Sequence, residues 1–475
     1  MKKISYIISM MLVVALLLAG CGNKEKDGND TNDGNQDKDN NVVENKDPEY
    51  IGNNLKYDIN SVVNNGEKID LVLWTDQEVE SFYTAAADSY MKIHDNVNIK
   101  IVVQPWGDYW TKLPLALNAG NGPDLYRSHP SFINNLKEKT YELPEDVFPM
   151  EQLKPDFPEV EKIKVDDKLY SIPLGTTFGG GIYYNKAMWT EAGLTETDIP
   201  KTWDEFAEIG KKLTKKDSKG NITQYGFSID HTFENMIIAL NLQKGEPIFK
   251  EDQFTWNFDN ETTYNNIDLL KDFKEDGFMM YSDGDCEDQM GNGQVAMIYQ
   301  WNWVGGYLNS SYPDVDWGFF MMPTEDGSVP PAYDTKVFEW LLSVSATDEK
   351  KREVAFDFLK YYVAENKNLI DNSMHIGVIP AKSIDISDDE RLKELPNIGM
   401  ANEYSDRLVF LGVIPTDEAK AKGLRSAGSD IFINNKEPKE VIKAFQKKLM
   451  EDTERNGIEY KSIENHYEYY SEFNK

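Results

Sequence analysis

Cysteine is nearly absent from this chain of 475 residues, which contains only Cys21 and Cys286. Once Cys21 is modified, as argued below, one free cysteine remains and no internal disulfide can form. Stability must then come from a hydrophobic core, and the chain is long enough for one core or for two lobes. The five histidines, His129 among them, are scattered without the spacing of metal ligands, so no metal site is expected.

Positive charge is also in short supply, because 50 lysines and arginines face 82 aspartates and glutamates. The formal net charge of −32 argues against nucleic acid or an anionic membrane surface as a partner, since both repel such a field. A small neutral ligand is compatible with this charge.

An uncharged apolar run at residues 4–18 follows Lys2 and Lys3 and is short for a membrane span but suitable for a secretory signal. It ends in the sequence LAGC, which resembles the bacterial lipobox, whose cysteine receives a lipid anchor. We therefore expect a signal peptide at 1–20 and lipid attachment, including palmitate, at Cys21. The alternative is an uncleaved anchor helix with an incidental cysteine. Either way, the chain is expected on the extracytoplasmic face of the cell membrane.

Residues 22–49 are rich in Asn, Asp, Lys, Gly and Glu, and Val42 and Val43 are the only aliphatic residues there. Such a composition cannot offset the entropy cost of ordering. We therefore expect a lipid-anchored, disordered tether, which we extend over residues 21–66 to the first predicted strand.

Predicted strands and helices alternate after the tether, which favours an α/β fold with a parallel sheet covered on both faces. The body exceeds one ordinary α/β domain, so two lobes are expected. The first predicted strands are 68–74, 97–103 and 123–126, with helices at 78–94 and 108–119. Later helices are expected at 202–213, 261–275, 349–364 and 439–456.

Four short segments carry a family resemblance through their order and spacing: KLYSIP at 168–173, IYYNK at 182–186, AGL at 192–194 and PKTWDEF at 200–206. With them, the chain resembles the extracellular solute-binding proteins that include the maltose-binding and multiple-sugar-binding proteins. The resemblance covers about residues 68–381.

The resemblance implies a two-lobed periplasmic-binding-protein fold (type II), with the ligand cleft between the lobes. Crossing strands are expected near 175–179, 321–325 and 376–382. Lobe 1 would combine 67–175 with 326–375, and lobe 2 would combine 176–325 with 376–475.

In function, the resemblance implies the substrate-binding lipoprotein of a bacterial ABC-type carbohydrate importer. It would bind a sugar or oligosaccharide by lobe closure and deliver it to the permease transmembrane subunits. We expect a monomer that needs no cofactor and binds no nucleic acid.

A sugar site needs polar groups that hydrogen-bond to hydroxyls and flat aromatic rings beneath the C–H faces. Asp76 and Gln77 follow the first strand, and ligands of open α/β sheets bind outside the carboxyl ends of such strands. The alternative for Asp76 is a helix cap. Tyr126 and Arg127 end the third strand, where relatives place a ligand-contacting residue. Arg127 could instead pair with an acid.

Trp303 is the favoured contact, because relatives place a tryptophan at this spacing beneath a sugar ring. Trp301 stands where relatives usually have glycine, so the cleft is narrower or holds a second aromatic platform. Core packing remains the alternative for both. The expected ligand-binding residues are Trp303, Trp301, Asp76, Gln77, Arg127, Tyr126, Phe178, Tyr183, Glu339 and Trp340.

Two further motifs have structural explanations. Thr202 and Glu205 form a capping box at a helix start, so neighbouring Trp203 is expected to touch no ligand. The acidic run 283–288 lacks the spacing of a calcium-binding EF-hand and is expected to be a solvated helix start.

Two other functions remain as alternatives. A secreted glycoside hydrolase needs two carboxylates across the scissile bond, and with so many acids in the chain their presence decides nothing. A binder of a peptide or another non-sugar solute would share the fold class but not the carbohydrate-family motifs. We therefore expect a binding protein without catalytic residues, not an enzyme.

Overall fold

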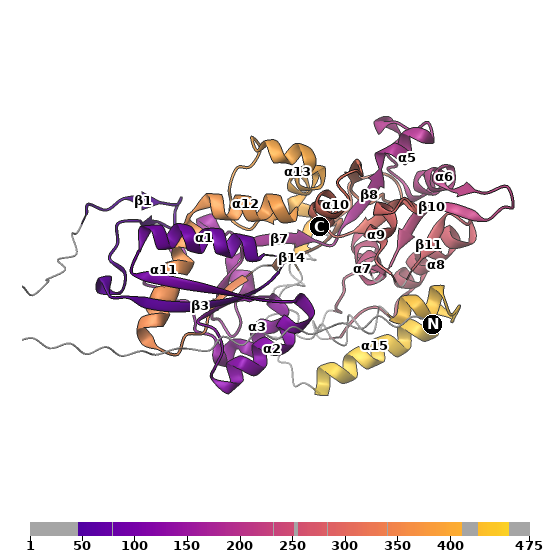
Figure 1. Ribbon diagram of the computed structural model, residues 1–475. Coiled ribbons are helices and arrows are strands. Elements are labelled where there is room, and N and C mark those ends of the chain that lie inside the picture. Colours follow the sequence, from indigo (N-terminus) through magenta and orange to yellow (C-terminus); the bar gives the residue numbers. More distant parts are fainter. Residues whose placement is uncertain are drawn as a thin grey trace, which may run out of the picture. The chain divides into compact units, whose positions relative to one another are not determined.

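The computed structural model describes residues 46–77, 79–230, 232–250, 255–282, 284–339, 341–410 and 426–455 (Figure 1). The expected signal peptide, Cys21 and most of the expected tether therefore lie outside the described residues. Within these ranges, every helix is too short or too polar to cross a bilayer.

A five-stranded sheet, which we call the first sheet, is built from the N-terminal part of the body. Its order is β4-β3-β5-β15-β6, with β3 parallel to β4 and β5, and β15 antiparallel to β5 and β6. Its strands are β3 (Ile69–Asp76), β4 (Val97–Gln104), β5 (Leu125–Ser128), β6 (Ser171–Ile172) and β15 (Leu341–Val344).

Helices cover both faces of the first sheet, as the alternating pattern predicts. Helix α1 (Glu80–Ile93) lies on one side of β3, and α2 (Trp106–Ala119) and α3 (Pro130–Leu136) lie on the other (Figure 1). The α1 side shares its apolar core with α11 (Glu349–Ala364). The α2 side has a smaller core.

The segment before the first sheet is folded from about residue 50, so the expected tether boundary at residue 66 is wrong. Strands β1 (Tyr50–Ile51) and β2 (Tyr57–Asp58) pair, and Leu55 and Tyr57 are buried. The Tyr57 hydroxyl also donates to Asp357 of α11 at 2.7 Å. These few apolar residues suffice because they pack on an existing core, which composition alone does not reveal.

A second sheet has the order β11-β10-β12-β8-β13, with β9 paired to β10. Strand β10 is parallel to β11 and β12, and β8 runs antiparallel to β12 and β13. Its strands are β8 (Gly181–Asn185), β9 (Lys215–Lys216), β10 (Ile222–Ile229), β11 (Met279–Tyr281), β12 (Val295–Gln300) and β13 (Trp317–Phe320).

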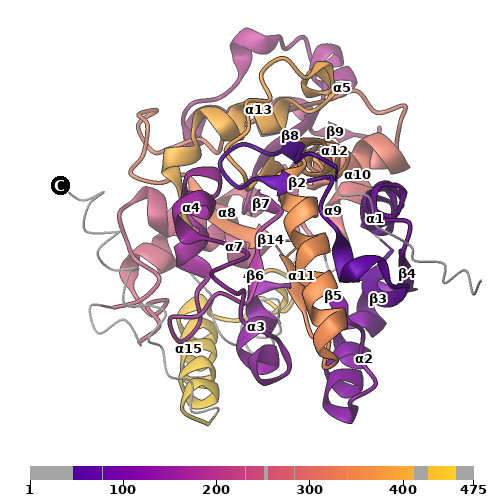
Figure 2. The ribbon, with the colours of Figure 1, turned by 90° about the vertical axis from the view of Figure 1, so that its left-hand side faces the viewer.

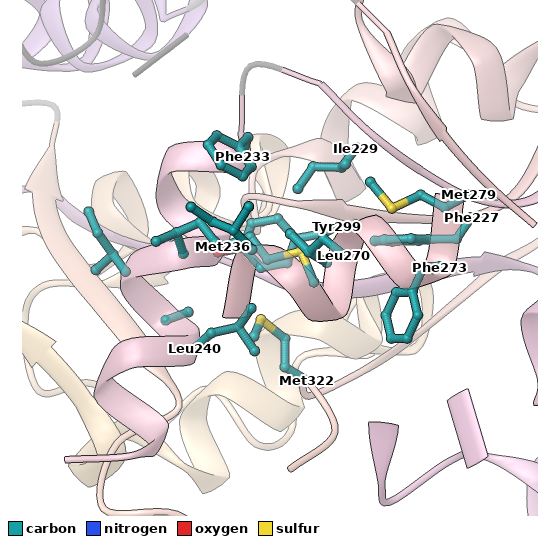
Figure 3. Packing of buried hydrophobic residues seen from close by; sticks show 14 of the residues in the cluster. Phe227, Ile229, Phe233, Met236, Leu240, Leu270, Phe273, Met279, Tyr299 and Met322 are labelled. Carbon is teal, nitrogen blue, oxygen red and sulfur yellow. The ribbon is translucent and has the colours of Figure 1, made fainter. Parts of the chain in front are cut away.

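Helices α7 (Phe233–Gln243) and α8 (Glu261–Glu275) bury a large apolar core against the second sheet (Figure 3). The expected capping box is confirmed: Thr202 accepts from the N–H of Glu205 at the start of α6 (Trp203–Leu213). Trp203 itself is buried in this core.

A third sheet of four strands connects the two parts of the chain, with the order β16-β7-β14-β17, in which β17 (Leu408–Phe410) is an edge strand. Strands β7 (Gly175–Phe178) and β16 (Ile379–Pro380) lie where crossing strands were expected. The remaining crossing is β14 (Asp334–Glu339), later than the expected 321–325. The reason is that Met322 and Thr324 still belong to the second-sheet side, where Thr324 donates its N–H to the carbonyl of Lys201.

The remaining elements pack around these sheets (Figure 2). They are α4 (Met150–Asp156), α5 (Lys186–Glu191), α9 (Cys286–Gly291), α10 (Val304–Ser311), α12 (Asn366–Ile376), α13 (Pro396–Glu403), α15 (Pro438–Arg455) and the 3-10 turns η1 (Val63–Gly66), η2 (Lys137–Lys139), η3 (Val160–Ile163), η4 (Glu196–Asp198), η5 (Glu390–Glu394) and η6 (Ser405–Arg407).

Candidate functional site

Asp76 and Arg127 form a buried ion pair at the carboxyl edge of the first sheet. Asp76 ends β3, Arg127 lies in β5, and Arg127 Nη1 donates to Asp76 Oδ2 at 2.5 Å. Both side chains are at most 1% exposed. The N-cap position of α1 belongs to Val79, so Asp76 is not its cap residue. The alternative considered for Arg127, an ion pair with an acidic residue, is present in the structure.

Gln77 and Trp106 lie beside this ion pair. Gln77 is exposed, and its Oε1 accepts the backbone N–H of Trp106 at 2.9 Å. The Arg127 Cζ lies 4.7 Å from the centroid of the Trp106 ring and 5.5 Å from that of Trp110. Sequence reasoning missed Trp106, although an aromatic residue directly after the strand 97–104 is a recognisable signal.

Tyr126 does not share this edge. It is buried in the core of the α2 side, and its hydroxyl lies 2.5 Å from Thr140 Oγ1. Its ring is fully buried and leaves no surface for a ligand in this conformation.

The two candidate tryptophans of the second sheet lie in the turn between β12 and α10, which we call the 301–303 turn. Trp301 and Trp303 are both partly exposed. Trp303 packs against apolar cores on both the first-sheet side and the second-sheet side, and its ring centroid lies 6.4 Å from that of Tyr307. Trp303 is therefore neither fully buried in one core nor fully exposed.

Tyr183 and Phe178 support the 301–303 turn from behind. The Tyr183 hydroxyl lies 3.0 Å from the carbonyl oxygen of Trp301 and 2.9 Å from that of Asn302, and donates to this pair. The Phe178 N–H donates to Asn302 Oδ1 at 3.1 Å. Both rings are fully buried, and burial raises the pKa of Tyr183 well above its usual value. They position the turn rather than expose a ring to a ligand.

Glu339 is the last residue of β14, but its side chain and the whole of Trp340 lie outside the described part of the chain.

A polar cluster is buried behind the 301–303 turn, at the carboxyl ends of β10 and β12. Gln300 Nε2 donates to Glu287 Oε2 at 2.8 Å and lies 3.2 Å from Asp230 Oδ2 and 3.3 Å from Cys286 Sγ. Burial raises the pKa of Glu287 to about 8, with further contributions from nearby carboxylates. The expectation of a solvated run is therefore wrong for Glu287, because the helix start faces inward here.

Asp230, Cys286 and Glu287 could in principle approach a metal ion, since their ligand atoms lie within 4.8 Å of one another. The Gln300 amide nitrogen, however, hydrogen-bonds to the same atoms and so serves the cluster as a donor. Because an amide NH2 group has two hydrogens, Gln300 can donate to two of these three acceptors at a time.

A separate pocket of about 190 Å³ opens on the third sheet. Its lining includes Thr176, Lys336 and Ile379, and Lys336 Nζ lies 2.9 Å from Glu159 Oε1. None of the expected ligand-binding residues lines this pocket.

Comparison with known sequences identifies the family of the chain. The family model described as bacterial extracellular solute-binding protein matches residues 75–366. An arabinooligosaccharide-binding protein of Bacillus subtilis is 26% identical, over 52% of this chain and 58% of the relative. A diacetylchitobiose binding protein of Streptomyces coelicolor is 25% identical, over 56% of this chain and 62% of the relative. The chain thus spans about six tenths of these two relatives.

Solved structures show the same fold. A cyclic alpha-maltosyl-1,6-maltose binding protein from Arthrobacter globiformis superposes with a TM-score of 0.66 at 16% identity, covering 82% of this chain and all of that chain. A maltose/maltodextrin-binding domain from Bdellovibrio bacteriovorus gives 0.64 at 18% identity, with coverages of 82% and 100%. The expected two-lobed α/β fold of periplasmic binding proteins is thereby confirmed. With the family model matched over most of its length, the chain belongs to the bacterial extracellular solute-binding proteins.

Proposed function

We propose that this protein is the substrate-binding component of a bacterial ABC-type carbohydrate importer and takes a neutral sugar or oligosaccharide as its ligand. The named relatives that bind oligosaccharides support this proposal. The observation that carries it is the 301–303 turn, which holds partly exposed tryptophans at the carboxyl end of β12 through buried hydrogen bonds. Rigid, amphipathic rings of this kind suit the C–H face of a sugar.

Binding would take place between two lobes, one built on the first sheet and one on the second. The expected bounds put lobe 1 at 67–175 with 326–375 and lobe 2 at 176–325 with 376–475. Because the crossing is β14 and Ala332 packs in the core of the second sheet, we move the boundary at 325 to β14, and we add the folded segment from residue 50 to lobe 1. Strands β7, β14 and β16 would act as the hinge. The ligand would favour a closed conformation because it contacts both lobes only there.

The family consists of binding proteins, and its name places it outside the cytoplasm. We further propose a lipid anchor at Cys21, a monomeric state and delivery of the ligand to permease transmembrane subunits. No bond is made or broken in this cycle, so the residues named above act as binding and positioning groups.

A thermal-shift panel tests this function directly. Purified protein is heated with neutral oligosaccharides, with acidic oligosaccharides and with peptides, and a raised melting temperature with a neutral oligosaccharide is expected. Chromatography of the same mixtures checks for products. Turnover of the sugar would identify a hydrolase, and a shift only with a peptide or an acidic solute would identify a different binder.

Trp303 provides the residue-level test. Trp303→Ala should abolish measurable binding in calorimetry, because the ring contact beneath the sugar is lost. Circular dichroism should show that the variant remains folded. Leu115→Ala, at an exposed position of α2, is the control and should bind normally. Unchanged affinity in Trp303→Ala would remove this residue from the site.

A further inference from the structure

Trp106 is a large apolar side chain that remains 38% exposed at a position suited to ligand contact. It opens α2 directly after β4, which pairs in parallel with β3, and β3 in turn pairs in parallel with β5. The carboxyl ends of parallel strands in an open α/β sheet are where such folds bind their ligands. An exposed indole at this edge therefore points to ligand contact more strongly than an exposed indole elsewhere on the surface does.

Three contacts hold Trp106 in one orientation. Gln77 Oε1 accepts its backbone N–H at 2.9 Å, and the Arg127 guanidinium lies 4.7 Å from its ring centroid. The ring of Trp110 meets it edge to face at 5.2 Å, and Trp110 is itself stacked on Phe132 at 4.4 Å. A ring already held in place loses little conformational freedom when a ligand binds, which favours affinity.

Arg127 is placed to support this ring rather than to bind an anion. Its side chain is 1% exposed, and its charge is matched by the buried carboxylate of Asp76 at 2.5 Å. A carboxylate or phosphate on a ligand would have to break this buried pair to reach the guanidinium, at a large cost. The edge therefore fits an uncharged sugar ring better than an acidic one.

We propose that Trp106 is the aromatic platform that contacts a neutral sugar ring from the first sheet, and that Arg127 is its positioning residue. This inference rests on the proposed carbohydrate-binding function and adds to it a contact residue and a structural reason for the preference for neutral over anionic ligands.

The test uses the full chain with maltotriose, diacetylchitobiose and arabinooligosaccharides as neutral probes and oligogalacturonate as the anionic one. For the neutral probe that wild type binds most tightly, Trp106→Ala should weaken binding at least tenfold. Trp106→Phe, which keeps a flat ring, should stay within about threefold. Leu115→Ala on the same helix is the matched control and should equal wild type. Wild type should bind oligogalacturonate at least tenfold more weakly than this neutral probe.

The role of Arg127 is tested by a double-mutant cycle with Arg127→Lys, which keeps the charge but loses the planar stacking group. If Arg127 acts through Trp106, the double variant Arg127→Lys/Trp106→Ala should bind no more weakly than Trp106→Ala alone. Additive losses would show that Arg127 acts independently, for example through Nε, which has no hydrogen-bond acceptor among the described residues.

Two outcomes separate this inference from the proposed function. Wild-type binding that survives in Trp106→Ala would overturn the platform and leave the function standing. Tighter binding of oligogalacturonate than of the neutral probes would overturn the ligand preference. A wild-type protein that binds none of the neutral probes would overturn the proposed function and the inference together.

Discussion

One residue of the buried polar cluster, Glu287, makes the stability of the fold depend on pH. Burial raises the pKa of Glu287 from an ordinary value of 4.5 to about 8. Between these values the folded protein keeps a proton that the unfolded chain has lost. The contribution of Glu287 to the free energy of unfolding is therefore fully present below about pH 4.5 and is lost as pH rises to about 8, by about 1.4 kcal/mol per pH unit within this window.

Glu287→Gln should remove this contribution, because its amide cannot ionise. Urea unfolding at pH 5, 6.5 and 8 should show a smaller loss of stability toward high pH in the variant than in wild type. Asp334, whose pKa burial raises to about 7, contributes in both proteins, so the difference between them is the informative quantity. Glu275→Gln at an exposed position is the control. Equal pH dependence in Glu287→Gln and wild type would contradict the assignment.

At the same scale, the sequence alone pointed to Asp76, Gln77, Arg127 and Trp303 through strand ends and family motifs. It could not show that Asp76 and Arg127 neutralise one another, because β3 and β5 become neighbours only in the folded sheet. Trp106 follows a predicted strand but was missed for a related reason, since two of its neighbours, Gln77 and Arg127, come from the ends of two other strands. Long-range packing, not local pattern, decides which side chains stay accessible.

Among the elements, the 301–303 turn depends on a hydroxyl from another strand. Tyr183→Phe removes one donor from two backbone carbonyls, which still accept the N–H groups of Val304 and Gly305, so it should cost about 1 kcal/mol of stability, as for one lost hydrogen bond. Sugar affinity should also fall several-fold, because the backbone that carries Trp301 and Trp303 loses one of its supporting hydrogen bonds. Calorimetry and urea unfolding measure the two effects.

Tyr184→Phe is the matched control, because Tyr184 lies in the same strand and packs against Trp189 and Phe320. It should retain affinity. Normal affinity in Tyr183→Phe, despite reduced stability, would mean that the turn does not present the binding surface.

Elements with local signals were the easiest to predict. The helices expected at 261–275 and 349–364 have those bounds in the structure, because Asn260 and Asp348 cap them with side-chain hydrogen bonds. Elements that depend on distant partners were not predictable in the same way. The crossing at β14 was expected at 321–325, too early in the chain. The short strands at 50–58 were assigned to the tether because this segment has few apolar residues.

For the whole molecule, the proposed cycle makes a measurable change of size. Saturating sugar should lower the radius of gyration in small-angle X-ray scattering, because closure brings the lobes together. It should also stabilise the fold by about 2.7 kcal/mol at a ligand concentration one hundred times the Kd. Trp303→Ala at the same sugar concentration is the control and should show neither change. Stabilisation without a change in radius would indicate capture without closure.

The support of the 301–303 turn has an evolutionary consequence. Three residues donate hydrogen bonds to Asn302 in this turn. The Tyr183 hydroxyl and Asn397 Nδ2 donate to its carbonyl oxygen, and the Phe178 N–H donates to its side-chain Oδ1. None of these bonds involves the indole of Trp301. The side chain at position 301 can therefore be substituted without loss of the bonds that hold the turn. Such a substitution could change which solute is bound while the backbone stays the same.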